Sequence, residues 1–149
     1  MKVYVLLADS AQADQTGKIH ALGLGWTRTA PITGSMAVIA LIQFEPGEDV
    51  TGQHDCVLEL LEEDGRPAAL QVPGREPVHL KLESTVEFKS EPGAPVTAPL
   101  VVNLGPGMPL KPGVTYAWRA TVDGKTDPTW EAQFATHPVS TDEHAASTS

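Results

Sequence analysis

Short apolar segments recur about every dozen residues along this chain, and turn-forming residues separate them, which is the pattern of an all-β domain. Residues 78–88 alternate strictly between apolar and polar side chains, as expected for a strand with one buried face. Residues 36–44 are continuously apolar, which indicates a strand that is buried on both faces. The expected strands are residues 2–8, 18–29, 36–44, 54–63, 67–72, 78–88, 100–104, 114–123 and 130–136.

The turn residues and the closing segment specify the fold class further. The 149 residues include 13 Gly and 13 Pro, more than in an average chain, so many tight turns are expected. Pro112-Gly113, the alternating Tyr116 and Trp118, and Asp123-Gly124 together resemble the last hairpin of immunoglobulin-like and fibronectin-type sandwiches. We therefore expect an antiparallel two-sheet sandwich, immunoglobulin-like, with eight or nine strands and no substantial helix.

The N-terminus allows two interpretations. Lys2, the apolar run at 3–8 and the small residues at 11–13 could form a secretion signal, or the run could be the first strand. A signal core needs about 7–15 apolar residues, and this run is shorter and is followed by Asp9. We therefore predict a strand and no signal peptide. Residues 1–136 are expected to form one domain, and the small, polar residues 137–149 a flexible tail.

The charge of the chain limits the kinds of partner. A formal net charge of −9, with Lys and Arg scattered singly, argues against nucleic acid binding, which needs clustered cations. No apolar run approaches the roughly 18 residues that a membrane-spanning helix needs. The single cysteine, Cys56, excludes an intrachain disulfide and lies in an apolar run, where a thiol is usually buried and unreactive. We expect no nucleic acid or membrane partner, and a cytoplasmic or virion-associated location.

No motif for catalysis or metal binding is found. The chain has no Gly-x-Ser-x-Gly nucleophile turn and no pair of histidines at zinc-ligand spacing, and His20, His54 and His79 are expected to face solvent on strands. We predict no enzyme activity, no cofactor and no metal. A hydrolase built from dispersed carboxylates is the least favoured alternative. The aspartates expected to close turns, rather than to bind calcium, are Asp9, Asp14, Asp49, Asp55, Asp123 and Asp127.

Tryptophans offer the candidate binding residues. Trp118 lies in mid-strand between apolar neighbours and is expected in the core. Trp26 follows Gly23 and Gly25, which would leave one strand face without side chains beside an indole, a surface for a ligand ring or for another chain. The alternative is that the protein's own loop packs there. Trp130, at the start of the closing strand, is the second candidate.

The opening segment is similar to a family of short, functionally uncharacterised β-sandwich proteins from actinobacteria and their phages. The resemblance implies a β-sandwich and carries no catalytic residue. We expect the Asp9 carboxylate to accept hydrogen bonds from the amides of Ala11 and Gln12, Gln12 to bridge backbone groups, and Gly17 to permit a bulge. The matching residues are Leu7, Ala8, Asp9, Ala11, Gln12, Gly17, Lys18, Ile19, Leu22, Gly23, Gly25 and Trp26, together with the closing Pro-Gly, Tyr-x-Trp-Arg and Asp-Gly motifs.

These observations favour a non-enzymatic β-sandwich that acts as a protein-interaction or structural module, through a protein partner or self-assembly. A phage virion decoration component, in the head or the tail, is one form of this hypothesis. The alternative hypothesis is a small-ligand or carbohydrate-binding sandwich that uses Trp26 or Trp130 as a stacking platform.

Overall fold

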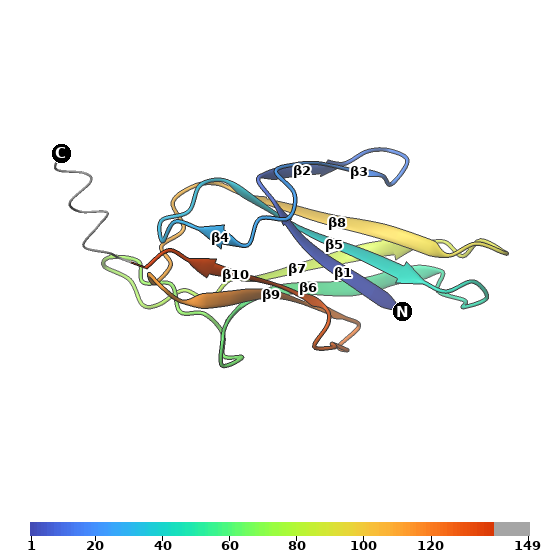
Figure 1. Ribbon diagram of the computed structural model, residues 1–149. Helices are drawn as coiled ribbons and strands as arrows, with labels where there is room; N and C mark the ends of the chain where they lie inside the picture. Colours follow the sequence, from blue (N-terminus) through green and yellow to red (C-terminus); the bar gives the residue numbers. More distant parts are fainter. Residues whose placement is uncertain (139–149) are drawn as a thin grey trace.

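The computed structural model describes residues 1–138, which form ten β-strands and no helix (Figure 1). The prediction of an all-β chain is confirmed, with more strands than expected. The predicted strand at residues 18–29 divides in two, because Gly23 and Gly25 have positive φ and turn the chain. The strands are β1 (Lys2–Ala8), β2 (Ser10–Ala13), β3 (Ile19–Leu22), β4 (Arg28–Thr29), β5 (Met36–Phe44), β6 (Gly52–Glu62), β7 (Lys81–Phe88), β8 (Val96–Leu104), β9 (Thr115–Val122) and β10 (Glu131–Thr136).

Two predicted strands, 67–72 and 100–104, differ clearly from the structure, and a proline lies in or directly before each of the two segments; the strand predicted at 78–88 begins only at Lys81. Residues 67–72 form only the isolated bridges Leu61–Pro67 and Leu70–Val78, since Pro67 has no N–H to continue a ladder beside β6. Strand β8 begins at Val96 and passes through Pro99, four residues earlier than predicted. It tolerates this proline because it lies at the edge of its sheet, where one row of backbone groups needs no strand partner.

The strands form three sheets. The first has the order β1-β5-β8, the second β4-β10-β9-β6-β7, and the third is the hairpin β2-β3. The pairing is antiparallel throughout residues 1–138 except between β4 and β10, which are parallel. The hydrogen bonds continue past the predicted end of the domain, because the His137 amide donates to the Thr29 carbonyl at 2.9 Å. The predicted tail lies, from residue 139 on, outside the described residues.

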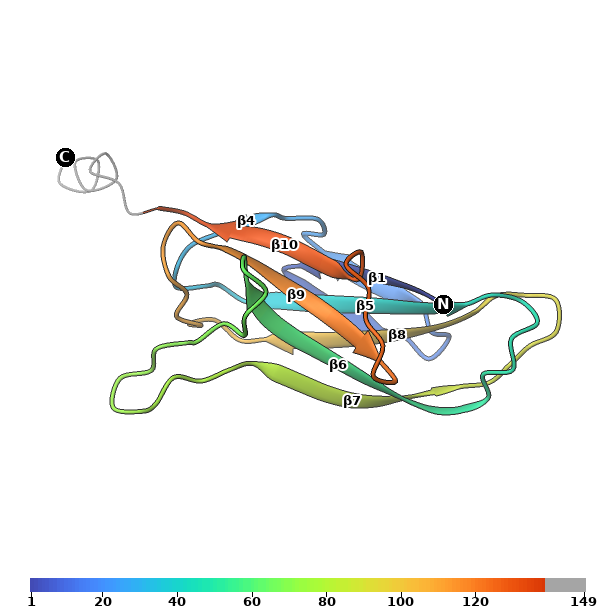
Figure 2. The ribbon, with the colours of Figure 1, turned by 90° about the horizontal axis from the view of Figure 1, so that it is seen from below.

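The three-stranded and the five-stranded sheets lie over one another (Figures 1 and 2), and one apolar cluster contains residues of both. The first sheet contributes Val5 from β1 and Ile42 from β5, and the second contributes Trp118 from β9, which is fully buried as predicted. Burying a large apolar side chain stabilises a fold by about 1.5–3 kcal/mol, so this shared cluster is the main source of stability. The predicted first strand therefore belongs to the core.

The hairpin β2-β3 covers the opposite face of the three-stranded sheet, away from β6 and β9 (Figure 1). Ala11 of the hairpin packs with Ala37 and Ile39 of β5 in a second, smaller cluster. Asn103 of β8 fastens the hairpin, because its side chain accepts from the Ala11 amide at 3.2 Å and donates to the Ala11 carbonyl at 2.8 Å. Strand β5 is thus buried on both faces, as its continuous apolar run predicts.

Candidate functional site

The predicted glycine site is a turn that lies beside the end of β1. Gly23 and Gly25 have φ of +67° and +92° and follow β3, so they do not leave the flat strand face that the sequence suggested. The turn is bonded to β1 at both ends: the Asp9 amide donates to the Leu22 carbonyl at 2.9 Å, and the Gly25 amide to the Leu7 carbonyl at 2.7 Å. A Cβ at Gly23 would overlap the Asp9 carboxylate, so close packing requires glycine there.

The connection between β1 and β3 differs from the predicted Asx turn. The Ala11 amide donates to Asn103 rather than to Asp9, because Ala11 has already entered strand β2. Gln12 is exposed on β2, opposite His20, and its side chain makes no hydrogen bond within residues 1–138. Gly17 has the expected left-handed φ of +83° in the turn between β2 and β3. That turn is held mainly by Asp14, whose carboxylate accepts from the Thr16 and Lys18 amides at 2.8 and 3.1 Å.

Trp26 packs inward instead of presenting its indole ring. It is half-buried against the main cluster and meets the Phe134 ring edge-on, with the ring centroids 5.4 Å apart. Its indole N–H is buried and finds no acceptor among the described residues, which costs free energy but is offset by burial of the ring. The structure therefore uses Trp26 as packing between the turn and β10.

Trp130 borders an open groove. The groove lies between the start of β1 and the β9–β10 turn, and it is lined by residues 1–4, Asp127, Thr129 and Trp130. The Trp130 carbonyl accepts from the Ala120 amide at 2.9 Å, and Asp127 accepts from the Thr129 amide at 2.9 Å, so the turn is braced by its own hydrogen bonds. The Thr129 hydroxyl also donates to the Asp127 carboxylate, at 2.7 Å, and together with the amide bond it holds the pKa of the Asp127 carboxyl below its ordinary value. The structure does not bring Trp26 and Trp130 into contact.

Exposed apolar side chains lie on β1, at the end of β3 and in the turn that follows β3. Tyr4 and Leu6 of β1 are 45% and 42% exposed, and Leu22 and Leu24 are 72% and 55% exposed. Tyr4 and Leu6 lie on the face of the three-stranded sheet opposite the main cluster, beyond the part that the hairpin β2-β3 covers. We call Tyr4, Leu6, Leu22 and Leu24 the N-terminal apolar surface. Its sequence signal is that both faces of β1 are apolar, whereas a strand with one solvated face alternates.

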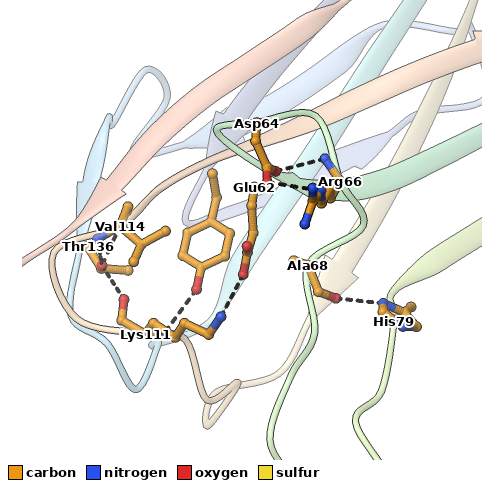
Figure 3. A network of polar contacts seen from close by, with 9 residues as sticks. Glu62, Asp64, Arg66, Ala68, His79, Lys111, Val114 and Thr136 are labelled. Atoms are coloured by element: carbon orange, nitrogen blue, oxygen red, sulfur yellow. Dashed lines mark hydrogen bonds and ion pairs between the residues drawn. The ribbon is translucent and has the colours of Figure 1, made fainter.

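A polar network links the end of β6, the segment before β9 and the end of β10 (Figure 3). The Lys111 ammonium donates to Glu62 at 3.0 Å, and its backbone amide donates to the Tyr116 hydroxyl at 2.9 Å. The Thr136 hydroxyl donates to the Lys111 carbonyl at 2.6 Å, which ties the segment before β9 to the end of β10. The ion pair with Glu62 raises the pKa of Lys111. The charged side chains Lys111 and Glu62 of this network are thus paired with each other.

The lone cysteine is buried, and the described residues form no group of metal ligands. Cys56 is only 1% exposed, and burial raises the pKa of its thiol to about 11, so it stays protonated and unreactive at neutral pH. Within residues 1–138 no three His, Cys, Asp or Glu side chains converge as metal ligands. The same residues contain no helix that could cross a membrane.

One polar pair was not foreseen. His54 was expected to face solvent, but its imidazole is mostly buried and lies 2.6 Å from the Asp123 carboxylate. Asp123 was expected to close a turn, and it does so with a positive φ of 50°. The pairing raises the pKa of His54 and lowers that of Asp123. Because the partners are 69 residues apart, no local pattern announces the pair.

Taken together, the fold and these sites define an all-β protein with exposed apolar side chains on and beside β1. Residues 3–134 match the family described as "Family of unknown function (DUF6941)", so the chain belongs to this family. No curated protein and no solved structure is significantly similar to the chain. An origin in actinobacteria or their phages stays a prediction.

Proposed function

We propose that the chain is a non-enzymatic, immunoglobulin-like sandwich of two sheets that acts as a protein-interaction module. Support for the sandwich comes from the shared apolar cluster between the sheets β1-β5-β8 and β4-β10-β9-β6-β7. The hairpin β2-β3 is then an addition that covers part of one outer face.

The observation that carries the proposal is the N-terminal apolar surface. Tyr4, Leu6, Leu22 and Leu24 are large apolar side chains that solvent reaches on β1, at the end of β3 and in the turn after it, and backbone bonds hold that turn beside the end of β1. Exposed apolar residues on neighbouring segments can mark an interaction site, whereas isolated ones need no explanation. The outer face of the five-stranded sheet differs, since it carries charged residues such as Glu59, Glu83 and Arg119. The partner, another protein or a second copy, is expected to contact the three-stranded sheet.

Site-specific crosslinking tests this orientation. A photo-crosslinking amino acid at Leu6 is compared with one at Thr121, which lies on the outer face of the five-stranded sheet. Sedimentation velocity of the purified chain over a range of concentrations reports self-assembly in parallel. We expect adducts from position 6, to a second copy or to one defined protein, and their loss in the variant Leu22→Lys. Equal labelling from positions 6 and 121, with a monomer at all concentrations, would refute the proposal.

The non-enzymatic part has its own test. Purified protein is assayed against generic ester, phosphate and glycoside substrates. We expect no turnover, because Cys56 is buried and the carboxylates Glu62 and Glu83 are engaged with Lys111 and Lys81 at 3.0 and 3.8 Å. Robust activity that disappears when a single carboxylate is changed contradicts this part of the proposal.

Trp130 supports a second candidate function, the binding of a small ligand or carbohydrate. It lines the open groove with residues 1–4, where a flat ring could stack on the indole. Titration of sugars and nucleotides, followed by tryptophan fluorescence in the native chain and in Trp130→Phe, tests it. A saturable change that requires Trp130 supports this function, and no change with any ligand counts against it.

A virion decoration role is one form of the first proposal and stays a prediction.

A further inference from the structure

His54 joins three separate parts of the fold. It lies near the start of β6, with Nδ1 2.6 Å from Oδ2 of Asp123 and Nε2 2.7 Å from the carbonyl oxygen of Val50. Val50 belongs to the connection 45–51 between β5 and β6, and Asp123 follows β9. The imidazole side chain is 18% exposed. One side chain therefore bridges a long connection and the β9–β10 turn.

Both partners of the imidazole are acceptors without a proton to donate. A carbonyl oxygen and a carboxylate oxygen each require an N–H, and a neutral imidazole has only one. The imidazolium has two N–H groups and satisfies both contacts. In the neutral form, one ring nitrogen would direct its lone pair at an oxygen atom, and that contact would become repulsive.

The surroundings hold the ring in place for either form. Phe44 of β5 and Phe88 of β7 flank it, with centroids 5.3 and 5.2 Å from the imidazole, and they meet each other edge-on at 4.8 Å. Asp123 is fixed independently of His54: its amide donates to the Asp55 carbonyl at 2.8 Å, and its Oδ1 accepts from the Asp55 amide at 3.0 Å. Loss of a proton would therefore weaken the contact with the Val50 carbonyl rather than the one with Asp123, while the Val50 side chain stays anchored in the main cluster.

That connection is fastened by few other bonds. The Val50 amide donates to the Ser90 hydroxyl at 2.9 Å, and this hydroxyl donates to the Glu48 carbonyl at 3.3 Å. The Ser90 amide donates to the Thr51 hydroxyl at 3.1 Å, so the segment after β7 is held with it. The Met1 ammonium lies 4.0 Å from Glu48. The bond from His54 to Val50 joins this group of loops to strand β6.

The charges around the ring favour its cationic form. Asp123 acts on it from the end of β9 and Asp55 from its own strand, and both raise the pKa of His54. Lys125, in the same turn as Asp123, lowers the pKa of the Asp123 carboxyl and so favours its charged form. The connection 45–51 contributes the charged residues Glu48 and Asp49, which precede Val50. Strands β5 and β7 contribute the rings of Phe44 and Phe88. Phe88 is preceded by Glu87 and followed by Lys89. The nearby Cys56 thiol stays protonated.

We propose that His54 is a proton-dependent latch, which holds the connection 45–51 in its imidazolium form and releases Val50 when the proton leaves. The neutral ring keeps its N–H on Asp123, the charged and closer acceptor, and its Nε2 lone pair then faces the Val50 carbonyl. This inference is independent of the proposed interaction function. The folded pKa lies above the unfolded value, so the stabilisation is complete below the unfolded pKa and is lost as pH rises through the folded pKa.

The test combines an NMR titration of the His54 ring with amide hydrogen exchange of the full chain. We expect His54 to titrate above the unperturbed value of about 6.5. Exchange protection of Val50 and Thr51, corrected for the intrinsic effect of pH, is expected to fall about fivefold with the same midpoint, the effect of losing one ordinary hydrogen bond. The amide of Trp118 in β9 serves as an internal reference and should keep its protection.

Two variants separate the latch from a merely structural histidine. Asp123→Asn tolerates the positive φ and still accepts from the Asp55 amide, but it removes the charge, so both midpoints should move to lower pH. His54→Gln should abolish the pH dependence, whereas His79→Gln, which alters an exposed histidine bonded to the Ala68 carbonyl, should retain it. The latch is refuted if His54 titrates at or below 6.5, if loop protection is independent of pH, or if Asp123→Asn leaves the midpoint unchanged.

Discussion

Replacing Gly23 by alanine should destabilise the protein more than the same change at Gly25, although both lie in one turn. Both glycines have positive φ, so each alanine costs about 1–2 kcal/mol of backbone strain. At Gly23 the new Cβ would also lie 2.5 Å from Cγ and 3.1 Å from Cβ of Asp9. At Gly25 it would meet no heavy atom within 4 Å. Moving the exposed Asp9 side chain out of its present rotamer adds about 0.5–1.5 kcal/mol.

The comparison of the two variants isolates the contact with Asp9. Urea unfolding at fixed pH, followed by tryptophan fluorescence, gives the free energy of unfolding of each variant. In a double-mutant cycle, Asp9→Ala should recover about 0.5–1.5 kcal/mol of the loss in Gly23→Ala, because it removes the carboxylate that the new methyl group overlaps. It should recover nothing in Gly25→Ala. Equal losses at the two glycines, or no coupling between Asp9 and Gly23, would refute the reasoning.

Three further predictions concern the hairpin, the network and the thiol. Asn103→Ala removes the side-chain partner of the Ala11 amide and carbonyl, so the free energy of opening the hairpin β2-β3 should fall by about 1–3 kcal/mol. Hydrogen exchange measures this, with the amides of β9 as the reference. Unchanged protection of the hairpin would contradict the prediction. Tyr116→Phe removes the hydroxyl that accepts from the Lys111 amide and should lower the free energy of unfolding by about 1–3 kcal/mol, as measured by urea denaturation. An unchanged free energy would show that this hydrogen bond contributes nothing. A thiol reagent should label Cys56 only when urea unfolds the protein, and fast labelling of the folded protein would contradict its burial.

The sequence pointed to several residues of the candidate site, but it did not predict which residues they contact. The opening motif drew attention to Asp9, Gly23 and Trp26, and the structure places the turn at Gly23 beside Asp9, with Trp26 against Phe134 of β10. Their roles differ from expectation, because a glycine pair in a strand and a glycine pair in a turn have the same sequence signature. Only the backbone angles, which depend on how the chain returns to β1, separate the two.

The long-range polar contacts could not be predicted. Asn103 and Ala11 are 92 residues apart, and His54 and Asp123 are 69 apart. Asn and His each have several ordinary uses on strands, and a pattern of neighbours does not tell which use applies. The N-terminal apolar surface was likewise hidden, because a strand with two apolar faces predicts burial on both sides. The hairpin β2-β3 covers only part of that outer face, so Tyr4 and Leu6 remain exposed.

The sequence by itself determined that this chain is all-β, where most of its strands lie, and that Trp118 is in the core. It could do so because the alternation of side chains along a strand and the backbone freedom of turn residues are local properties. Only the tertiary structure decided which strands pair, that β2-β3 covers one outer face, and that His54 meets Asp123 and Val50. Those outcomes depend on segments far apart in the chain, whose packing and hydrogen bonds exist only when the whole fold has formed.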